Sequence, residues 1–271
     1  RRVYSLIKLE LDSIIQNLIE ISKLAGAEIL DVYEGSFDVT IKDDLSPLTD
    51  ADRRSNQIIT DRLESLYPEI PILSEEGKQI DYSIREKWDL FWLIDPLDGT
   101  KEFVKRNGEF TVNIALINHG KPIAGVVYAP VNSTCWYGSG KNGSYKLEGN
   151  SRPTKINVKS DAENPIKIVS SRSHPSPKLQ SYLNRFTNHE MVGMGSSLKI
   201  CLVADGSAHI YPRLGPTMEW DSGAGHAVLK FAGGYLTDVS TGNELVYNKE
   251  ILRNPDFICY GPKIKERYEV L

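Results

Sequence analysis

The sequence contains no long apolar segment and few cysteines. None of its apolar runs approaches the roughly 18 residues that a membrane-spanning helix requires, so we expect no transmembrane segment. The three cysteines, Cys135, Cys201 and Cys259, lie far apart and include no CxxC pair, which argues against a disulfide framework and a cysteine-based metal site. We therefore expect buried, reduced thiols and a cytoplasmic location, with peripheral association with the inner membrane left open.

Excess charge is also small. The chain of 271 residues has 32 Lys and Arg against 36 Asp and Glu, a net charge of −4. A general nucleic-acid-binding protein needs a basic surface, so we expect no nucleic acid as the main partner, whereas a small anionic substrate stays open. Hydrophobic residues make up 40% and charged residues 25%, which argues against a disordered chain and allows one large domain or two packed half-domains.

Apolar periodicity predicts alternating helices and strands. Steps of three and four residues predict helices at residues 3–32 and 52–66. We expect further helices at residues 176–186, 197–205 and 221–232. We expect strands at residues 70–73, 90–94, 110–117, 123–128, 166–170, 208–211, 235–238 and 256–260, of which the third and fourth form a hairpin. Residues 138–153 are rich in turn-forming side chains around one short strand. This alternation predicts a mixed α/β sandwich with halves at residues 1–160 and 161–271.

Two aspartates follow the apolar strand at residues 90–94. The segment reads Asp95-Pro96-Leu97-Asp98-Gly99-Thr100. Pro96 and Gly99 favour a tight turn, so both carboxylates and the carbonyl of Leu97 could face one point. Hard divalent cations prefer such oxygens, and Mg²⁺ usually takes one or two carboxylates from a protein. The same spacing also fits a simple turn that ends a strand, so the segment alone leaves both interpretations open.

Three other acidic positions stand at the ends of predicted elements. Glu75 follows a short strand, which on its own indicates a solvated loop. Asp221 precedes small residues that open an apolar helix, so it fits either an N-cap or a metal ligand beside a helix N-terminus that faces a phosphate. Thr49 to Asp52 precedes another helix and fits a capping motif.

Together and in this order, these segments resemble the inositol monophosphatase superfamily of Mg²⁺-dependent, lithium-sensitive phosphatases. The two hallmarks are the DPxDGT segment at residues 95–100 and the WDxxAG-type segment at residues 220–225. Within the superfamily, the chain most resembles CysQ-type 3′(2′),5′-bisphosphate nucleotidases, enzymes of sulfur assimilation. The stretches that support this match are residues 44–52, 72–76, 171–174 and 195–225. Gly223 departs from the Ala of many relatives, and we expect it to loosen the helix start slightly.

The resemblance implies a fold, a metal site and a catalytic pair. The fold is a layered α-β-α-β-α sandwich of the α/β (α+β) class, with the metals between its two halves. The implied ligands of two or three Mg²⁺ ions are Glu75, Asp95, Asp98, Asp221 and the carbonyl of Leu97. Asp52 and Thr100 are expected to orient the attacking water, and Glu75 to take part by holding the metal that activates this water. Inhibition by Li⁺ is likewise implied.

The resemblance further implies adenosine 3′,5′-bisphosphate as the substrate, hydrolysed to AMP and phosphate, with the 5′-phosphosulfate analogue as a further candidate. A second phosphate needs cations away from the metals, and Lys199 and Arg213 are candidates, with Ser196 as a donor. His174 is expected to contact the nucleoside. The full set of expected substrate contacts is Leu97, Asp98, Gly99, Thr100, His174, Ser196, Lys199, Arg213 and Asp221. The other four histidines are expected to be structural.

Two alternatives stay open. An inositol or other sugar monophosphatase would keep the metal site but would need no cations for a second phosphate, so Lys199 and Arg213 count against it. A non-catalytic metal- or nucleotide-binding regulator on the same fold would usually lack a ligand or the water-orienting pair, and here all of these residues are present.

Overall fold

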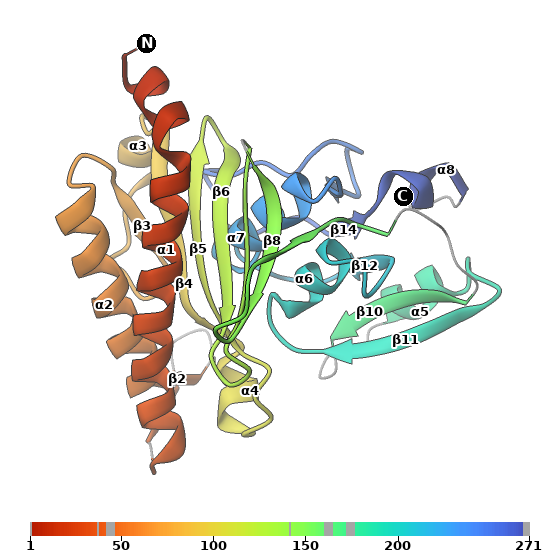
Figure 1. The fold of residues 1–271 in the computed structure, drawn as a ribbon. Coiled ribbons are helices and arrows are strands. Elements are labelled where there is room, and N and C mark those ends of the chain that lie inside the picture. The colour runs from red at the N-terminus through yellow and green to blue at the C-terminus, as the bar shows by residue number, and fades with distance from the viewer. Residues whose placement is uncertain are drawn as a thin grey trace.

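Two β-sheets and the helices around them form five layers (Figure 1). The computed structural model describes residues 2–36, 38–41, 47–140, 142–159, 165–171 and 177–267. The helices are α1 Arg2–Glu34, α2 Asp50–Leu66, α3 Tyr82–Arg85, α4 Thr100–Val104, α5 Pro177–Leu183, α6 Leu198–Ala204, α7 Glu219–Phe231 and α8 Pro262–Arg267. Helices α1 and α2 lie outside the first sheet, α6 and α7 between the sheets, and α5 and α8 outside the second sheet.

The first sheet has seven strands in the order β3-β4-β5-β6-β7-β8-β9. Their bounds are β3 Ile72–Ser74, β4 Leu90–Asp98, β5 Thr111–Asn118, β6 Lys121–Ala129, β7 Thr134–Ser139, β8 Gly143–Glu148 and β9 Thr154–Ile156. Only the β3–β4 pair is parallel. A separate antiparallel pair, β1 Val39–Ile41 and β2 Pro47–Thr49, leads into α2.

The second sheet has five strands in the order β11-β10-β12-β14-β13. Their bounds are β10 Ile166–Ser171, β11 His189–Met194, β12 Ile210–Arg213, β13 Tyr235–Asp238 and β14 Phe257–Tyr260. Strand β10 is parallel to both β11 and β12, whereas β14 is antiparallel to its two neighbours.

Three apolar clusters fill the spaces between the layers. Ile114 and Leu116 of β5 pack with α1 and α2, whereas Ala115 and Ile117 pack with α6 and α7 on the opposite face. This alternation follows from the two-residue period of a strand, and a sheet covered on both faces is apolar throughout, as β5 is. A third cluster joins the second sheet to α5 and α8.

Glycines bring α7 close to the first sheet. A Cβ atom at Gly125 of β6 would lie 2.7 Å from the carbonyl oxygen of Ala224 and 2.7 Å from Cβ of Ala227. A Cβ atom at Gly223 would lie 2.7 Å from a methyl group of Leu93. Gly223 therefore gives the helix room to approach β4, a role that the expected loosening of the helix start did not anticipate.

Most of the predicted elements are confirmed. Both long N-terminal helices, the β5–β6 hairpin and the strands and helices of the second half are present within a few residues of the predicted bounds. Strands β1, β2, β7, β9 and β11 and the short helices α3, α4 and α8 were not predicted. The tight turn predicted at residues 95–100 is wrong, because β4 continues to Asp98 across an irregularity in its pairing with β5.

The division into halves at residues 160 and 161 stays a prediction, since residues 160–164 lie outside the described residues. The three cysteines are free and buried, as predicted. Among the described residues, no helix is both long enough and apolar enough to cross a bilayer.

The close approach of α7 to β6 gives a stability prediction. We expect Gly125→Ala to lower the free energy of unfolding by about 1–3 kcal/mol, because the new methyl group meets backbone rather than a movable side-chain end. Gly215→Ala is the matched control, since a Cβ atom there meets nothing within 4 Å. Urea unfolding of both variants would measure the difference, and equal stabilities would contradict the packing argument.

Candidate active site

Three carboxylates meet where β3, β4 and α7 come together. Glu75, Asp95 and Asp221 each offer an oxygen within 4.8 Å of the others. Parallel pairing sets Ser74 beside Ile94, and the Glu75 N–H donates to the Ile94 carbonyl at 3.1 Å. Glu75, which follows β3, therefore lies beside Asp95 of β4. Asp221 reaches the same place from the first turn of α7.

The electrostatics of this acidic cluster favour a cation. Burial, then the charges of Glu75, Asp98 and Asp221, raise the pKa of Asp95 well above its ordinary value. Burial, then Asp98 and Glu75, raise the pKa of Asp221 to about 8. Asp95 Oδ2 is buried and has no hydrogen-bond donor among the described residues. Crowded, desolvated carboxylate oxygens of this kind suit a hard divalent cation, so these residues fit the expected Mg²⁺ site.

The other two predicted metal ligands lie beside the cluster. Asp98 is close enough for its charge to act on both Asp95 and Asp221, although its oxygens are not among the three that converge most closely. The Leu97 carbonyl oxygen lies 3.3 Å from Thr100 Oγ1. Their roles as ligands stay predictions.

The predicted catalytic pair is in contact. Thr100 Oγ1 lies 3.2 Å from Asp52 Oδ1, and it is the donor because the carboxylate can only accept. Asp52 Oδ2 accepts from the N–H of Thr49 at 2.7 Å and from its hydroxyl at 2.6 Å. Asp52 therefore binds the start of α2 with one oxygen and contacts Thr100 with the other, so the capping interpretation does not exclude the catalytic role, which stays a prediction.

Asp221 also serves a helix start, but at a different position from the one predicted. Helix α7 begins at Glu219, with Met218 as its N-cap, so Asp221 is the third helical residue and not the N-cap. Its Oδ2 accepts the Met218 N–H at 2.9 Å. A carboxylate at this position interacts favourably with the positive end of the helix dipole. The hydrogen bond from Met218 also holds it in one orientation.

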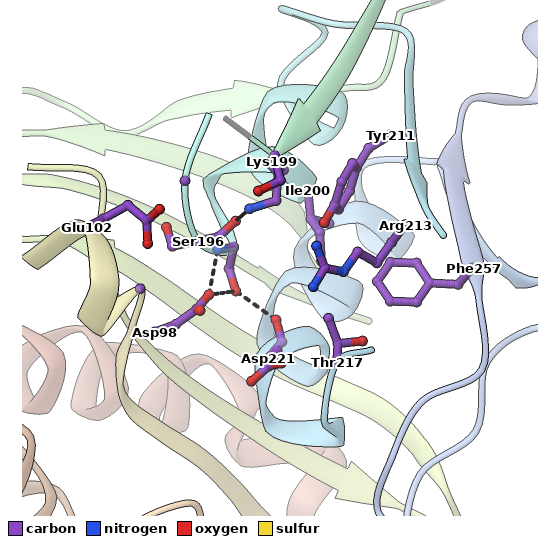
Figure 2. Close-up of a pocket in the computed structure, with 14 residues that line it drawn as sticks. Asp98, Glu102, Ser196, Lys199, Ile200, Tyr211, Arg213, Thr217, Asp221 and Phe257 are labelled. Atoms are coloured by element: carbon purple, nitrogen blue, oxygen red, sulfur yellow. Dashed lines mark hydrogen bonds between the residues drawn. The ribbon is translucent and has the colours of Figure 1, made fainter. Parts of the chain in front are cut away.

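A cavity of about 110 Å³ adjoins the acidic cluster (Figure 2). Asp98 and Asp221 form its wall on the side of the cluster, and Lys199, Tyr211 and Arg213 point into it from the second half of the chain. The lining residues are Asp98, Gly99, Glu102, Ser171, Gly195, Ser196, Ser197, Lys199, Ile200, Tyr211, Arg213, Thr217, Asp221 and Phe257. The predicted substrate residues Gly99, Ser196, Lys199 and Arg213 are thus brought together.

The two cations of the cavity are incompletely neutralised. Lys199 is 6% exposed, donates to the Ser196 carbonyl at 2.5 Å and lies 5.7 Å from the ring centre of Tyr211. Burial lowers the pKa of Lys199 to about 8, an effect that Asp98 opposes and Arg213 reinforces. Arg213 Nη2 donates to the Pro216 carbonyl at 2.7 Å, whereas its buried Nε has no partner among the described residues. A buried lysine and a half-buried arginine facing one small cavity suit an anion.

Gly99 of the DPxDGT segment lies in contact with Ser196 of the stretch at residues 195–225. Gly99 has φ 94°, a conformation that favours glycine, and a Cβ atom there would lie 3.2 Å from Cβ of Ser196 and 3.1 Å from the Glu109 carbonyl. Of the predicted site residues, His174 lies outside the described residues, so its contact with the nucleoside stays a prediction.

Several residues of the cavity were not predicted from the sequence. Glu102, Tyr211, Thr217 and Phe257 line the cavity from four different elements or loops. Of these four residues, only Tyr211 and Thr217 lie in the stretch at residues 195–225 that supports the family match, and no role was predicted for either. The other four histidines, His119, His189, His209 and His226, are absent from the lining, which agrees with a structural role.

The chain belongs to the inositol monophosphatase family. The family model matches residues 10–268, nearly the whole chain. The predicted membership, the layered sandwich and the assignment to a family of phosphatases are thereby confirmed.

Within this family, the chain is similar to several proteins named CysQ. The 3′(2′),5′-bisphosphate nucleotidase CysQ of Escherichia coli strain K12 is 48% identical over 241 residues, covering 88% of this chain and 96% of the relative. The enzyme of the same name from Haemophilus influenzae is 34% identical over 252 residues, covering 92% and 93%. The crystal structure of CysQ from Bacteroides thetaiotaomicron shares 40% identity with a TM-score of 0.83, covering 93% of this chain and 98% of that one.

Without a cation, the repulsion in the acidic cluster should make the stability of the protein depend on pH. Because the pKa of Asp221 is raised from 3.8 to about 8, the folded chain binds more protons than the unfolded chain between these values. The free energy of unfolding in chelator should therefore fall as pH rises from about 4 to 8. Asp221→Asn removes this contribution, so its urea midpoint should fall less steeply than that of the wild type. Parallel curves in EDTA from pH 5 to 8 would refute the assignment.

Proposed function

We propose that the protein is a Mg²⁺-dependent 3′(2′),5′-bisphosphate nucleotidase that hydrolyses adenosine 3′,5′-bisphosphate to AMP and phosphate. The observation that carries this proposal is the juxtaposition of an acidic cluster with a cavity that holds Lys199 and Arg213. The cluster suits a metal-assisted phosphatase, and the two cations suit a second phosphate on the same substrate. The relatives at 34–48% identity bear the name of this activity.

In this proposal, each group of residues has a separate task. The cation ligands are Glu75, Asp95, Asp98, Asp221 and the carbonyl of Leu97. Mg²⁺, when bound, supplies Lewis acidity for the attacking water and for the leaving oxygen. Lys199, Arg213 and Ser196 hold the second phosphate, which aligns the 3′-phosphate with the acidic cluster and lowers the entropic cost of reaction.

The Thr100–Asp52 pair orients the water. The hydroxyl proton of Thr100 is directed to Asp52 Oδ1, so a lone pair of Thr100 Oγ1 is available to accept a hydrogen from the water. Asp52 is held in turn by the two hydrogen bonds from Thr49. The water is thereby fixed through a chain of buried groups rather than through a mobile side chain.

The proposal also covers inhibition and substrate range. Li⁺ inhibits the reaction, and the 5′-phosphosulfate analogue is a second substrate that binds through the same two cations. An inositol or sugar monophosphate lacks the group that Lys199 and Arg213 would bind, and we expect slower turnover for it. The cytoplasmic location and the role in sulfur assimilation stay predictions.

The first test is phosphate release from adenosine 3′,5′-bisphosphate, with Mg²⁺ and with chelator, and with AMP identified as the product. We expect rapid release that chelator abolishes. Turnover of inositol 1-phosphate alone would discard the nucleotide pocket and keep the metal site. Absence of release from both substrates would reject the proposed activity in favour of the non-catalytic regulator or a different phosphate ester.

Arg213→Ala tests the assignment of the second phosphate. We expect the KM for adenosine 3′,5′-bisphosphate to rise about 10- to 100-fold, because a charge-assisted hydrogen bond of about 1.5–3 kcal/mol is lost. The KM for adenosine 3′-monophosphate, which lacks that phosphate, should change much less. Arg54→Ala is the matched control, since the Arg54 guanidinium pairs with Asp50 and Asp31 on the exposed surface of α2. An equal loss for both substrates would disprove the assignment.

A further inference from the structure

Ser197 joins the two segments that carry Asp98 and Asp221. It precedes α6 and is 3% exposed. Its backbone N–H donates to Asp98 Oδ2 at 2.6 Å, and its Oγ lies 2.7 Å from the same oxygen. The same Oγ lies 2.7 Å from the backbone carbonyl of Asp221 (Figure 2, dashed lines at Asp98 and Asp221). One buried residue therefore contacts both the end of β4 and the first turn of α7.

Asn113 of β5 completes this connection. It is 1% exposed, and its Nδ2 donates to Ser197 Oγ at 2.8 Å and to Asp98 Oδ2 at 3.4 Å. Thr111 Oγ1 donates to Asn113 Oδ1 at 3.0 Å, which fixes the side-chain amide with its NH₂ group toward Ser197. Asp98 Oδ2 is thus surrounded by donors from two residues outside the acidic cluster.

Proton counting shows how Ser197 can serve both aspartates. A serine hydroxyl has one proton and two lone pairs. Here one lone pair accepts from Asn113, so the proton goes either to Asp98 Oδ2 or to the Asp221 carbonyl. Because the Ser197 N–H already contacts Asp98, the hydroxyl can turn to Asp221 while Asp98 stays held. Both segments are therefore attached to Ser197 when the hydroxyl donates to the Asp221 carbonyl and the backbone N–H donates to Asp98.

The attachment opposes a repulsion. Asp98 and Asp221 are carried by different elements, and their negative charges favour separation. Ser196 and Lys199 belong to the same turn as Ser197, and the Lys199 Nζ is bonded to the Ser196 carbonyl. A shift at Ser197 would therefore move the aspartates and the cations of the cavity relative to one another.

We propose that Ser197, supported by Asn113, is a positioning residue that sets the spacing and orientation of Asp98 and Asp221. It thereby prepares the cation site before the cation arrives. The inference rests on the proposed function, since that proposal takes both aspartates as ligands. Outer groups that orient ligands typically change metal affinity 10- to 100-fold when removed.

The experiment measures cation affinity directly, without turnover. Mn²⁺ is titrated into metal-free wild-type protein, Ser197→Ala and Asn113→Ala, and free Mn²⁺ is followed by electron paramagnetic resonance. We expect each variant to raise the dissociation constant at least tenfold. The double variant should add little to either single change, because both act through one network. Should Ser197→Ala fail to fold, Asn113→Ala carries the same comparison.

Ser144→Ala is the matched control. Ser144 of β8 is fully buried, and its Oγ donates to the Val228 carbonyl of the same helix, α7, at 2.6 Å. This variant loses the same kind of hydrogen bond without touching the acidic cluster. It should lower the urea midpoint as much as Ser197→Ala does, but its Mn²⁺ dissociation constant should equal that of the wild type.

The outcomes separate the two proposals. Wild-type Mn²⁺ affinity in both Ser197→Ala and Asn113→Ala would overturn the positioning role, even if the wild-type protein hydrolyses adenosine 3′,5′-bisphosphate. Weakened Mn²⁺ binding in both variants would support the role, even if the wild-type protein leaves this nucleotide intact and the proposed substrate is lost.

Discussion

The repulsion among buried carboxylates is the constraint on which the rest of the structure depends. Glu75, Asp95 and Asp221 converge where burial and like charge raise the pKa of both aspartates. Such a cluster costs free energy, so the segments that carry it must be fixed by contacts that the repulsion cannot break. The parallel β3–β4 register holds two of the carboxylates side by side, and the first turn of α7 holds the third. The same concentration of negative charge favours binding of a divalent cation by the acidic cluster.

Two aspartates that the proposed function places in the active site also bind the starts of helices. Asp52 and Asp221 are each the third residue of a helix, and each accepts the N-cap N–H with Oδ2. In Asp52, the other oxygen accepts the Thr100 hydroxyl. The hydrogen bonds at the helix start are therefore compatible with the site role that we propose for each carboxylate. The cap is the device that fixes the carboxylate, because a side chain bound to its own backbone has few orientations left.

Features that depend on neighbouring residues were predictable from the sequence, whereas features that depend on contacts between distant segments were not. Helices α1 and α2 and the β5–β6 hairpin follow from local apolar spacing, and residues such as Asp95 and Asp221 follow from motifs that resemble a family. Strand β11 was missed because it lies at a sheet edge, where half-exposed and exposed residues show no alternation. The turn expected at Pro96 is overridden by pairing with β5, which keeps Asp98 opposite Thr111. No role was predicted for Asn113 or Ser197, because their contacts exist only once β4, β5 and α7 are neighbours.

The glycine contacts beneath α7 have a consequence for how the site is aligned. Gly125 of β6 admits the backbone of Ala224, and Gly223 admits a methyl group of Leu93, so at these two points the helix meets the strands at close range. A helix seated in this way can neither roll nor slide without a backbone collision. The sheet therefore fixes the position of α7, and α7 in turn fixes the position of Asp221 in its first turn. Loss of cation binding should accordingly arise from bulky substitutions along this seam, in residues that never touch the cavity.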